Sequence, residues 1–229
     1  MAYQISEANL SDAHAIASLF SISWTSSFAN LLYGEFNPQD LANTLAAKIT
    51  EQMVEPTTKF IVARSETERV VSVAQWTVPV DNESVNRETR EEKEERERFE
   101  DELYWKKLPD SSNKDLLMDF NGGLRRLKEE TLQGKKFFYL GNLATHREHR
   151  GKGLASKLIE WTFPQADEKA HLVYLETASD NPARRLYEKL GFRETGRSTI
   201  DDLSRYGGEG SHTHVALIRY PNISADTGH

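Results

Sequence analysis

Residues 147–155 read Arg-Glu-His-Arg-Gly-Lys-Gly-Leu-Ala, and this stretch decides the fold. The run before it, residues 137–145, is apolar and aromatic, which predicts a strand. The run after it places Leu154, Leu158 and Trp161 on one face of a helix that we expect to continue to Phe163. Glycine permits close backbone approach, and the first N–H groups of a helix lack partners within it. The turn therefore predicts a diphosphate site, although such a turn can also simply begin a helix.

Two other phosphate-binding motifs are missing from the sequence. It contains no Gly-x-x-x-x-Gly-Lys-Ser/Thr run, which argues against a P-loop nucleotidase. It also lacks Gly-x-Gly-x-x-Gly with the spacing of a dinucleotide site.

A second segment, residues 171–192, predicts another strand followed by a capped helix. Residues 171–177 are rich in the branched and aromatic residues that suit strands. Asn181 can serve as N-cap, Pro182 suits the first helical position, and Gly191 suits the position after the helix end.

These two segments together resemble the acyl-CoA-binding motifs of the GCN5-related N-acetyltransferase (GNAT) superfamily. In the first motif, Arg150, Gly153 and Ala155 fill the places of Arg or Gln, Gly, and Gly or Ala. In the second, Asn181 is followed by Leu-Tyr and Gly-Phe at the family's spacing. The resemblance is close from about residue 139 to 195 and only topological elsewhere.

The resemblance implies an α/β fold, the GNAT acyl-CoA N-acyltransferase fold. We expect a mixed, largely antiparallel sheet flanked by helices and splayed between its fourth and fifth strands. The rest of the chain fits that order, with a strand at residues 3–5, helices at 11–24 and 38–53, a hairpin of 59–63 and 70–78, and final strands at 192–198 and 212–219. We expect residues 1–229 to form one domain.

A charged helical insertion, about residues 81–136, is expected between the third and fourth strands. Residues 87–98 are almost all charged, with opposite signs four residues apart, which predicts a solvated helix. Apolar residues from Phe99 to Leu108 give its C-terminal end something to pack against the body. A second helix should cover residues 116–132, where Gly122 and Gly123 either bend it or mark a close approach. In the resembled fold this insertion lies near the acceptor side, which makes it a candidate substrate lid.

Composition excludes several classes of protein. The net charge of −7 argues against nucleic acid as a partner. The absence of cysteine removes disulfides, thiolate metal sites and a thiol nucleophile. With no apolar run of about 18 residues and no signal pattern, we expect a cytoplasmic protein, monomer or homodimer, that does not bind membranes.

The resemblance also implies the residues that bind CoA. The backbone of the turn would hold the diphosphate, the preceding strand would pair with the pantetheine arm, and a backbone N–H of Leu143 or Ala144 would polarise the thioester carbonyl. The expected cofactor-binding set is Leu143, Ala144, Thr145, Arg150, Gly151, Lys152, Gly153, Leu154, Ala155, Ser156, Asn181, Arg184 and Tyr187. Asn181 has a structural explanation as well, as a cap.

Two residues are candidates for proton transfer. Tyr187 occupies the position at which the family often places the acid that protonates the leaving thiolate; the alternative is a tyrosine that only packs. Glu176, a charge in an apolar strand, is the first candidate for the base that deprotonates the amine. It can equally be a structural ion-pair partner.

The histidines form two pairs. His146 and His149 flank the turn and, with no cysteine or carboxylate cluster nearby in sequence, indicate rim residues rather than a metal site. His212 and His214 share one face of a strand and either line the acceptor pocket or are solvated.

The expected function is acetyl transfer from acetyl-CoA to an amine of a small molecule, by direct attack in a ternary complex and without a metal. Two alternatives stay open. One is a protein acetyltransferase acting on lysine or an N-terminus, and the other is a non-catalytic acyl-CoA-binding module.

Overall fold

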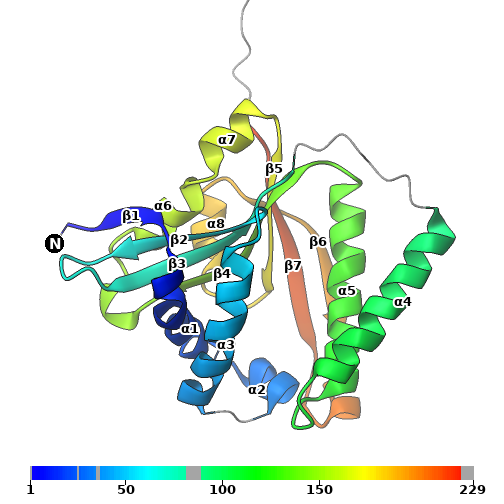
Figure 1. The fold of residues 1–229 in the computed structure, drawn as a ribbon. Helices are drawn as coiled ribbons and strands as arrows, with labels where there is room; N and C mark the ends of the chain where they lie inside the picture. Colours follow the sequence, from blue (N-terminus) through cyan, green and yellow to red (C-terminus); the bar gives the residue numbers. More distant parts are fainter. Residues whose placement is uncertain (1, 25, 35–36, 81–88, 223–229) are drawn as a thin grey trace, which may run out of the picture.

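The computed structural model describes residues 2–24, 26–34, 37–80 and 89–222 (Figure 1). Seven strands form one sheet in the order β1-β2-β3-β4-β5-β7-β6. Every neighbouring pair is antiparallel except β4 and β5, which run parallel. The strands are β1 Gln4–Glu7, β2 Thr58–Arg64, β3 Val70–Thr77, β4 Phe137–Thr145, β5 Leu172–Ala178, β6 Arg193–Ile200 and β7 His212–Arg219. The expected mixed, largely antiparallel sheet is confirmed.

Helices cover both faces of this sheet (Figure 1). They are α1 Ala13–Ser21, α2 Ser27–Tyr33, α3 Pro38–Met53, α4 Arg90–Lys107, α5 Lys114–Leu132, α6 Leu154–Glu160, α7 Phe163–Glu168 and α8 Arg184–Lys189. Short 3-10 turns lie at Leu10–Asp12, Arg147–His149 and Leu203–Tyr206. None of the helices in the described residues is long and apolar enough to span a membrane.

Side-chain alternation along the strands divides the core into two layers. Phe60 and Val62 of β2 pack with α1 and α3, while Ile61 and Ala63 point to the opposite face, which α6 and α8 cover. On the β5–β7 half of the sheet, α5 replaces α1 and α3, packing Leu127 onto the face that carries Tyr174. The insertion was expected near the acceptor side of the sheet. Because it contributes α5, the acceptor side would be the face covered by α1, α3 and α5.

A bulge in β4 changes which side chains face each layer. The register with β3 shifts so that Gln75 pairs with Asn142 but Trp76 pairs with Leu140, which leaves Gly141 as the extra residue. Leu140 before the bulge and Leu143 after it therefore belong to the same layer. Without the bulge, this odd spacing would place them on opposite faces.

The insertion between β3 and β4 forms the two helices α4 and α5, as expected. The helix α5 passes through Gly122 and Gly123 without interruption. A Cβ on Gly123 would lie 2.5 Å from Ser198 Oγ, and one on Gly196 of β6 would lie 2.9 Å from Leu127 Cδ1. The glycines therefore mark a close approach between α5 and β6.

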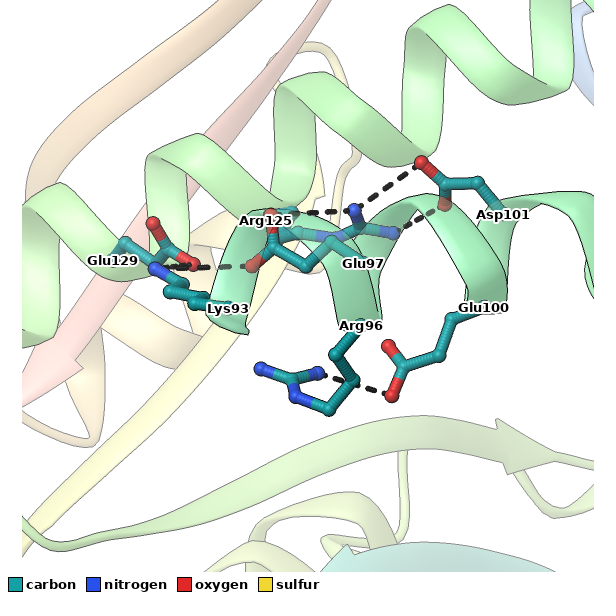
Figure 2. A network of polar contacts seen from close by, with 7 residues as sticks. All are labelled: Lys93, Arg96, Glu97, Glu100, Asp101, Arg125 and Glu129. Atoms are coloured by element: carbon teal, nitrogen blue, oxygen red, sulfur yellow. Dashed lines mark hydrogen bonds and ion pairs between the residues drawn. The ribbon is translucent and has the colours of Figure 1, made fainter. Parts of the chain in front are cut away.

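Ion pairs join α4 to α5 (Figure 2). The Lys93 ammonium lies 2.7 Å from Glu129, and the Arg125 guanidinium lies 2.6 Å from Asp101. Within α4, Arg96 pairs with Glu100 four residues on. One side of the charged segment thus faces α5 rather than solvent alone. The first residues of the insertion, 81–88, lie outside the described part of the chain.

Strand bounds shift by one or two residues, and the larger differences from the predicted elements lie in the helices. The first helix ends at Ser21, before Trp24, and the separate helix α2 was not predicted. The helix after the glycine turn ends at Glu160, and α7 begins at Phe163 with Pro164 in its first turn. The last helix begins at Arg184, with Ala183 rather than Asn181 at its N-cap.

Candidate functional site

The parallel strands β4 and β5 separate after a short contact. Only three residue pairs join them, from Phe137 and Leu172 to Tyr139 and Tyr174. Beyond Tyr139, residues Leu143, Ala144 and Thr145 pair only with β3, on the other side of β4. In the segment predicted to bind the pantetheine arm, β4 therefore makes no strand pairing with β5.

A glycine turn follows the end of β4. Gly151 and Gly153 have φ of +74° and +73°, and Gly153 is the N-cap of α6 without a side-chain cap. A Cβ on either glycine would meet nothing within 4 Å, so the surface of the turn is open to a ligand. Arg150 Nε donates to the Thr145 carbonyl at 3.2 Å, which ties the turn to the strand. Lys152 lies 5.8 Å from the ring of Tyr3.

This turn and the helix that follows it have two features that suit an anion. Positive φ angles at the two glycines turn the backbone, and α6 begins directly after them with Leu154, Ala155 and Ser156. The first N–H groups of that helix are unsatisfied within it and suit an anion. The predicted diphosphate residues are thus brought together at the end of the predicted pantetheine strand.

Glu176 lies on β5 two residues after the last pair with β4. Its side chain shares a face with Tyr174, because strand residues two apart point the same way. Burial raises the pKa of Glu176, and the phenols of Tyr174 and Tyr139 and the ammonium of Lys128 counteract that rise. The alternative of a structural ion pair is not supported by distance, since no Lys or Arg nitrogen of the described residues is paired with Glu176 within 4.0 Å. Glu176 is a partly buried carboxyl beside the split.

Tyr139 and Tyr174 were not predicted as site residues. Burial, and next the charge of Glu176, raises the pKa of both phenols. The Tyr174 hydroxyl is buried without a hydrogen-bond partner among the described residues. The sequence places only Tyr174 on the same strand face as Glu176, two residues before it; the approach of Tyr139 comes from the pairing of β4 with β5.

Tyr187 lies on the opposite face of the sheet from Glu176. It is 6% exposed and packs against Phe192, with ring centroids 6.0 Å apart. Burial raises the pKa of Tyr187 to about 12, so the phenol keeps its proton at neutral pH. Packing and acid catalysis are both compatible with this position.

Asn181 and Arg184 make contacts within the protein. The Asn181 carbonyl oxygen accepts from Ala183 N–H at 2.9 Å, and its amide donates to Thr177 Oγ1 at 2.8 Å. Asn181 therefore caps the turn before α8. The Arg184 guanidinium donates to the Ser179 carbonyl at 3.0 Å and to Glu194 at 2.9 Å. Their predicted contacts with the cofactor remain predictions.

The second histidine pair belongs to an aromatic cluster rather than to solvent. His212 Nε2 lies 2.9 Å from His214 Nδ1, and the His212 ring stacks on Phe28 of α2 with centroids 3.4 Å apart. Phe120 of α5 meets His214 edge-on at 4.8 Å. Burial, with a smaller contribution from His212, lowers the pKa of His214 to about 4, so that ring is neutral at neutral pH.

The first histidine pair lies at the edge of a cavity of about 230 Å³ that Tyr3 also lines. The Tyr3 hydroxyl lies 2.9 Å from His149 Nδ1. His146, Glu148 and His149 bring possible ligand atoms within 4.8 Å of one another. Glu148 is the one carboxylate in this group, and no carboxylate cluster joins it among the described residues.

A parallel strand pair that separates beside an open glycine turn defines the acyl-CoA N-acyltransferase fold. Residues 121–194, about a third of the chain, match the family model described as "Acetyltransferase (GNAT) domain". The resemblance to the GNAT superfamily is therefore confirmed over residues 121–194. No curated protein matches the chain.

Solved structures extend the likeness over nearly the whole chain. Arylalkylamine N-acetyltransferase 2 from Aedes aegypti has a TM-score of 0.64 at 15% identity, covering 97% of this chain and 100% of that one. Polyamine N-acetyltransferase from Drosophila melanogaster has a TM-score of 0.61 at 12% identity, with coverage of 96% and 100%. A structure described as histone acetyltransferase HPA2 and related acetyltransferase, from Corynebacterium glutamicum, has a TM-score of 0.56 at 18% identity. The match covers 98% of this chain and 99% of that one. At these identities, the likeness establishes the fold alone.

Proposed function

We propose that the chain is an acetyl-CoA-dependent N-acetyltransferase that acts on a small-molecule amine, with both substrates bound together. The observation that carries the proposal is the split of β4 from β5 after three residue pairs, with the open glycine turn at the end of β4. We also propose that residues 1–229 form a single domain, because one sheet runs from β1 to β7.

The chain's own residues supply the binding site for the CoA arm and diphosphate. Backbone groups of Leu143, Ala144 and Thr145 would pair with the arm as a further strand would. N–H groups from Arg150 to Ser156 would hold the diphosphate, with Lys152 adding charge at the rim. When bound, acetyl-CoA supplies the activated acetyl group. An N–H at Leu143 or Ala144 would polarise its carbonyl, as an oxyanion donor does.

Two groups on opposite faces of the sheet would move protons. The Glu176 carboxylate would accept a proton from the acceptor amine on the α5 face. Tyr187, on the α6 and α8 face, would donate its hydroxyl proton to the departing sulfur. Because burial favours the neutral forms of both groups, Glu176 is a stronger base than a solvated carboxylate, and Tyr187 retains its proton.

A small acceptor is favoured over a protein by the cover on the acceptor face. The helix α5 packs on the β5–β7 face that carries Glu176, and α4 lies outside α5 (Figure 1). The names of two structural neighbours refer to arylalkylamines and polyamines, which agree with a small amine. A protein acetyltransferase would need an open groove for a peptide.

Release of the CoA thiol from acetyl-CoA tests the proposal. The assay compares arylalkylamines, polyamines and aminoglycosides with lysine-containing peptides and with buffer alone. At least one small amine should accelerate release and gain an acetyl group by mass. Acceleration by peptides alone would favour the protein acetyltransferase, and CoA binding without any accelerated release would indicate a non-catalytic module.

A further inference from the structure

The inserted helix α5 places a lysine over the rings beside the β4–β5 split. The Lys128 ammonium lies 4.7 Å from the ring centroid of Tyr139 and 5.0 Å from that of Phe137. Both rings belong to β4, immediately before the split. A cation over an aromatic face at these distances is attracted by the ring quadrupole. Lys128 is therefore held at the site by the strand it covers.

The pairing of β4 with β5 brings Glu176 close to the rings that Lys128 covers. Tyr139 is paired with Tyr174, their ring centroids are 5.9 Å apart, and Glu176 follows Tyr174 by two residues on the same face. The titratable and charged groups that act on the Glu176 carboxyl are the phenols of Tyr174 and Tyr139 and the Lys128 ammonium. On the β7 side its partner is Ala216, which carries no charge. Lys128 is the one cation in this set.

Packing fixes the helix that carries Lys128. Leu127, its neighbour in α5, is 4% exposed and packs with Tyr174 and Ala216. The glycine at 196 lets α5 pack close to β6, since a Cβ there would lie 2.9 Å from Leu127. This packing fixes the helix backbone from which the Lys128 side chain extends.

We propose that Lys128 is a positioning residue for Glu176, whose charge it stabilises from the aromatic faces of Phe137 and Tyr139. This role rests on the proposed function of Glu176 as the base. An ionised carboxylate is needed to take the proton from the acceptor nitrogen. After the transfer, the carboxyl is neutral beside a positive charge, which favours loss of that proton to water before the next cycle. The insertion thus contributes a residue to the proton transfer and also covers the face of the sheet that carries Glu176.

Lys128 can influence the ionisation of Glu176 because the dielectric around the carboxyl is low. Burial disfavours the charged form of a carboxyl, and a nearby cation restores it. Charges interact more strongly here than at the surface because less water screens them. Lys128 can therefore change the fraction of Glu176 that is ionised without forming a direct ion pair with it.

The test compares Lys128→Met with Lys128→Arg and with Lys135→Met, which removes a charge from an exposed position after α5. The Glu176 side chain is titrated by carbon NMR in the full chain without substrates, and its signal is identified with Glu176→Gln. The pH dependence of kcat/KM is measured for the four proteins, wild type included, with one amine acceptor. The melting temperature of each variant reports any loss of folding.

Lys128→Met should raise the pKa of Glu176 and move the acid limb of the pH profile to higher pH in the same direction. Its kcat/KM should fall at neutral pH and recover as the pH is raised, while Lys128→Arg and Lys135→Met should match wild type. A wild-type Glu176 titration in Lys128→Met overturns the proposal, whatever the activity. A shifted titration with an unshifted pH profile shows instead that Glu176 is not the proton acceptor, which overturns its proposed function and with it the role of Lys128.

Discussion

Gly153→Ala should separate stability from CoA binding. The backbone at Gly153 has φ of +73°, and the space where a Cβ would stand is empty to 4 Å. The substitution therefore meets no neighbour in the folded protein and costs only the left-handed backbone conformation, about 1–2 kcal/mol. For a chain of this size, each kcal/mol lowers the melting temperature by roughly 2–4 °C. The same methyl group would stand where a diphosphate must contact the turn.

The effect on CoA binding should exceed the effect on folding. A ligand at 100 times its Kd stabilises the folded protein by about 2.7 kcal/mol. If the methyl group weakens binding a hundredfold, the same CoA concentration gives only about 0.4 kcal/mol. The thermal shift with CoA should therefore be clear in wild type and nearly absent in Gly153→Ala.

Gly207→Ala is the matched control. Gly207 has φ of +80°, an equally empty Cβ position, and lies at the C-cap of the 3-10 turn Leu203–Tyr206. It should lose similar stability and keep the full thermal shift with CoA. If Gly153→Ala also keeps that shift, the diphosphate does not bind at this turn and the reasoning fails.

Three further outcomes are expected. Tyr187→Phe should lower kcat by roughly ten- to a thousandfold with little change in CoA affinity, since it removes one general acid and keeps the ring; unchanged kcat in a chemistry-limited reaction would make the tyrosine structural. Incubation with acetyl-CoA alone should leave the intact mass unchanged, because no cysteine is available; an acetylated enzyme that passes its acetyl group to an amine would refute direct transfer. Arg125→Met should speed amide exchange in α4 at a stability cost below about 1 kcal/mol, because its pairs with Asp101 and Glu97 are partly exposed. The control is Arg126→Met, and equally fast exchange of α4 in both variants would contradict this.

The sequence predicted the elements around the cofactor motifs well, because their signals are local. The strand Phe137–Thr145 has the predicted bounds, and Gly191 has the positive φ, +89°, expected after a helix. The helix α2 was not predicted, although Ser26 at its N-cap and Gly34 after its end are ordinary boundary signals. The helix α2 is short, and the apolar pattern of the preceding helix continues in the sequence to Trp24. Pro164 likewise marks the start of α7.

The surroundings of Glu176 could not be predicted, because they come from three elements. Tyr139 is on β4, Tyr174 is on β5 and Lys128 is on α5, a helix for which the family motif gives no position. The sequence showed a charge in an apolar strand and left open an ion pair or a base. Only the fold brings the phenols and the ammonium to it. The histidines at 212 and 214 show the same limit, since their aromatic neighbours lie on α2 and α5.

Amide hydrogen exchange with and without CoA tests the account most directly. The account predicts protection by CoA concentrated in two segments, Leu143–Thr145 at the open edge of β4 and Arg150–Ser156 at the glycine turn. Both would gain hydrogen bonds from the ligand. Protection elsewhere, with these two segments exchanging as in the free protein, would contradict the assignment of the β4–β5 split as the acyl-CoA site.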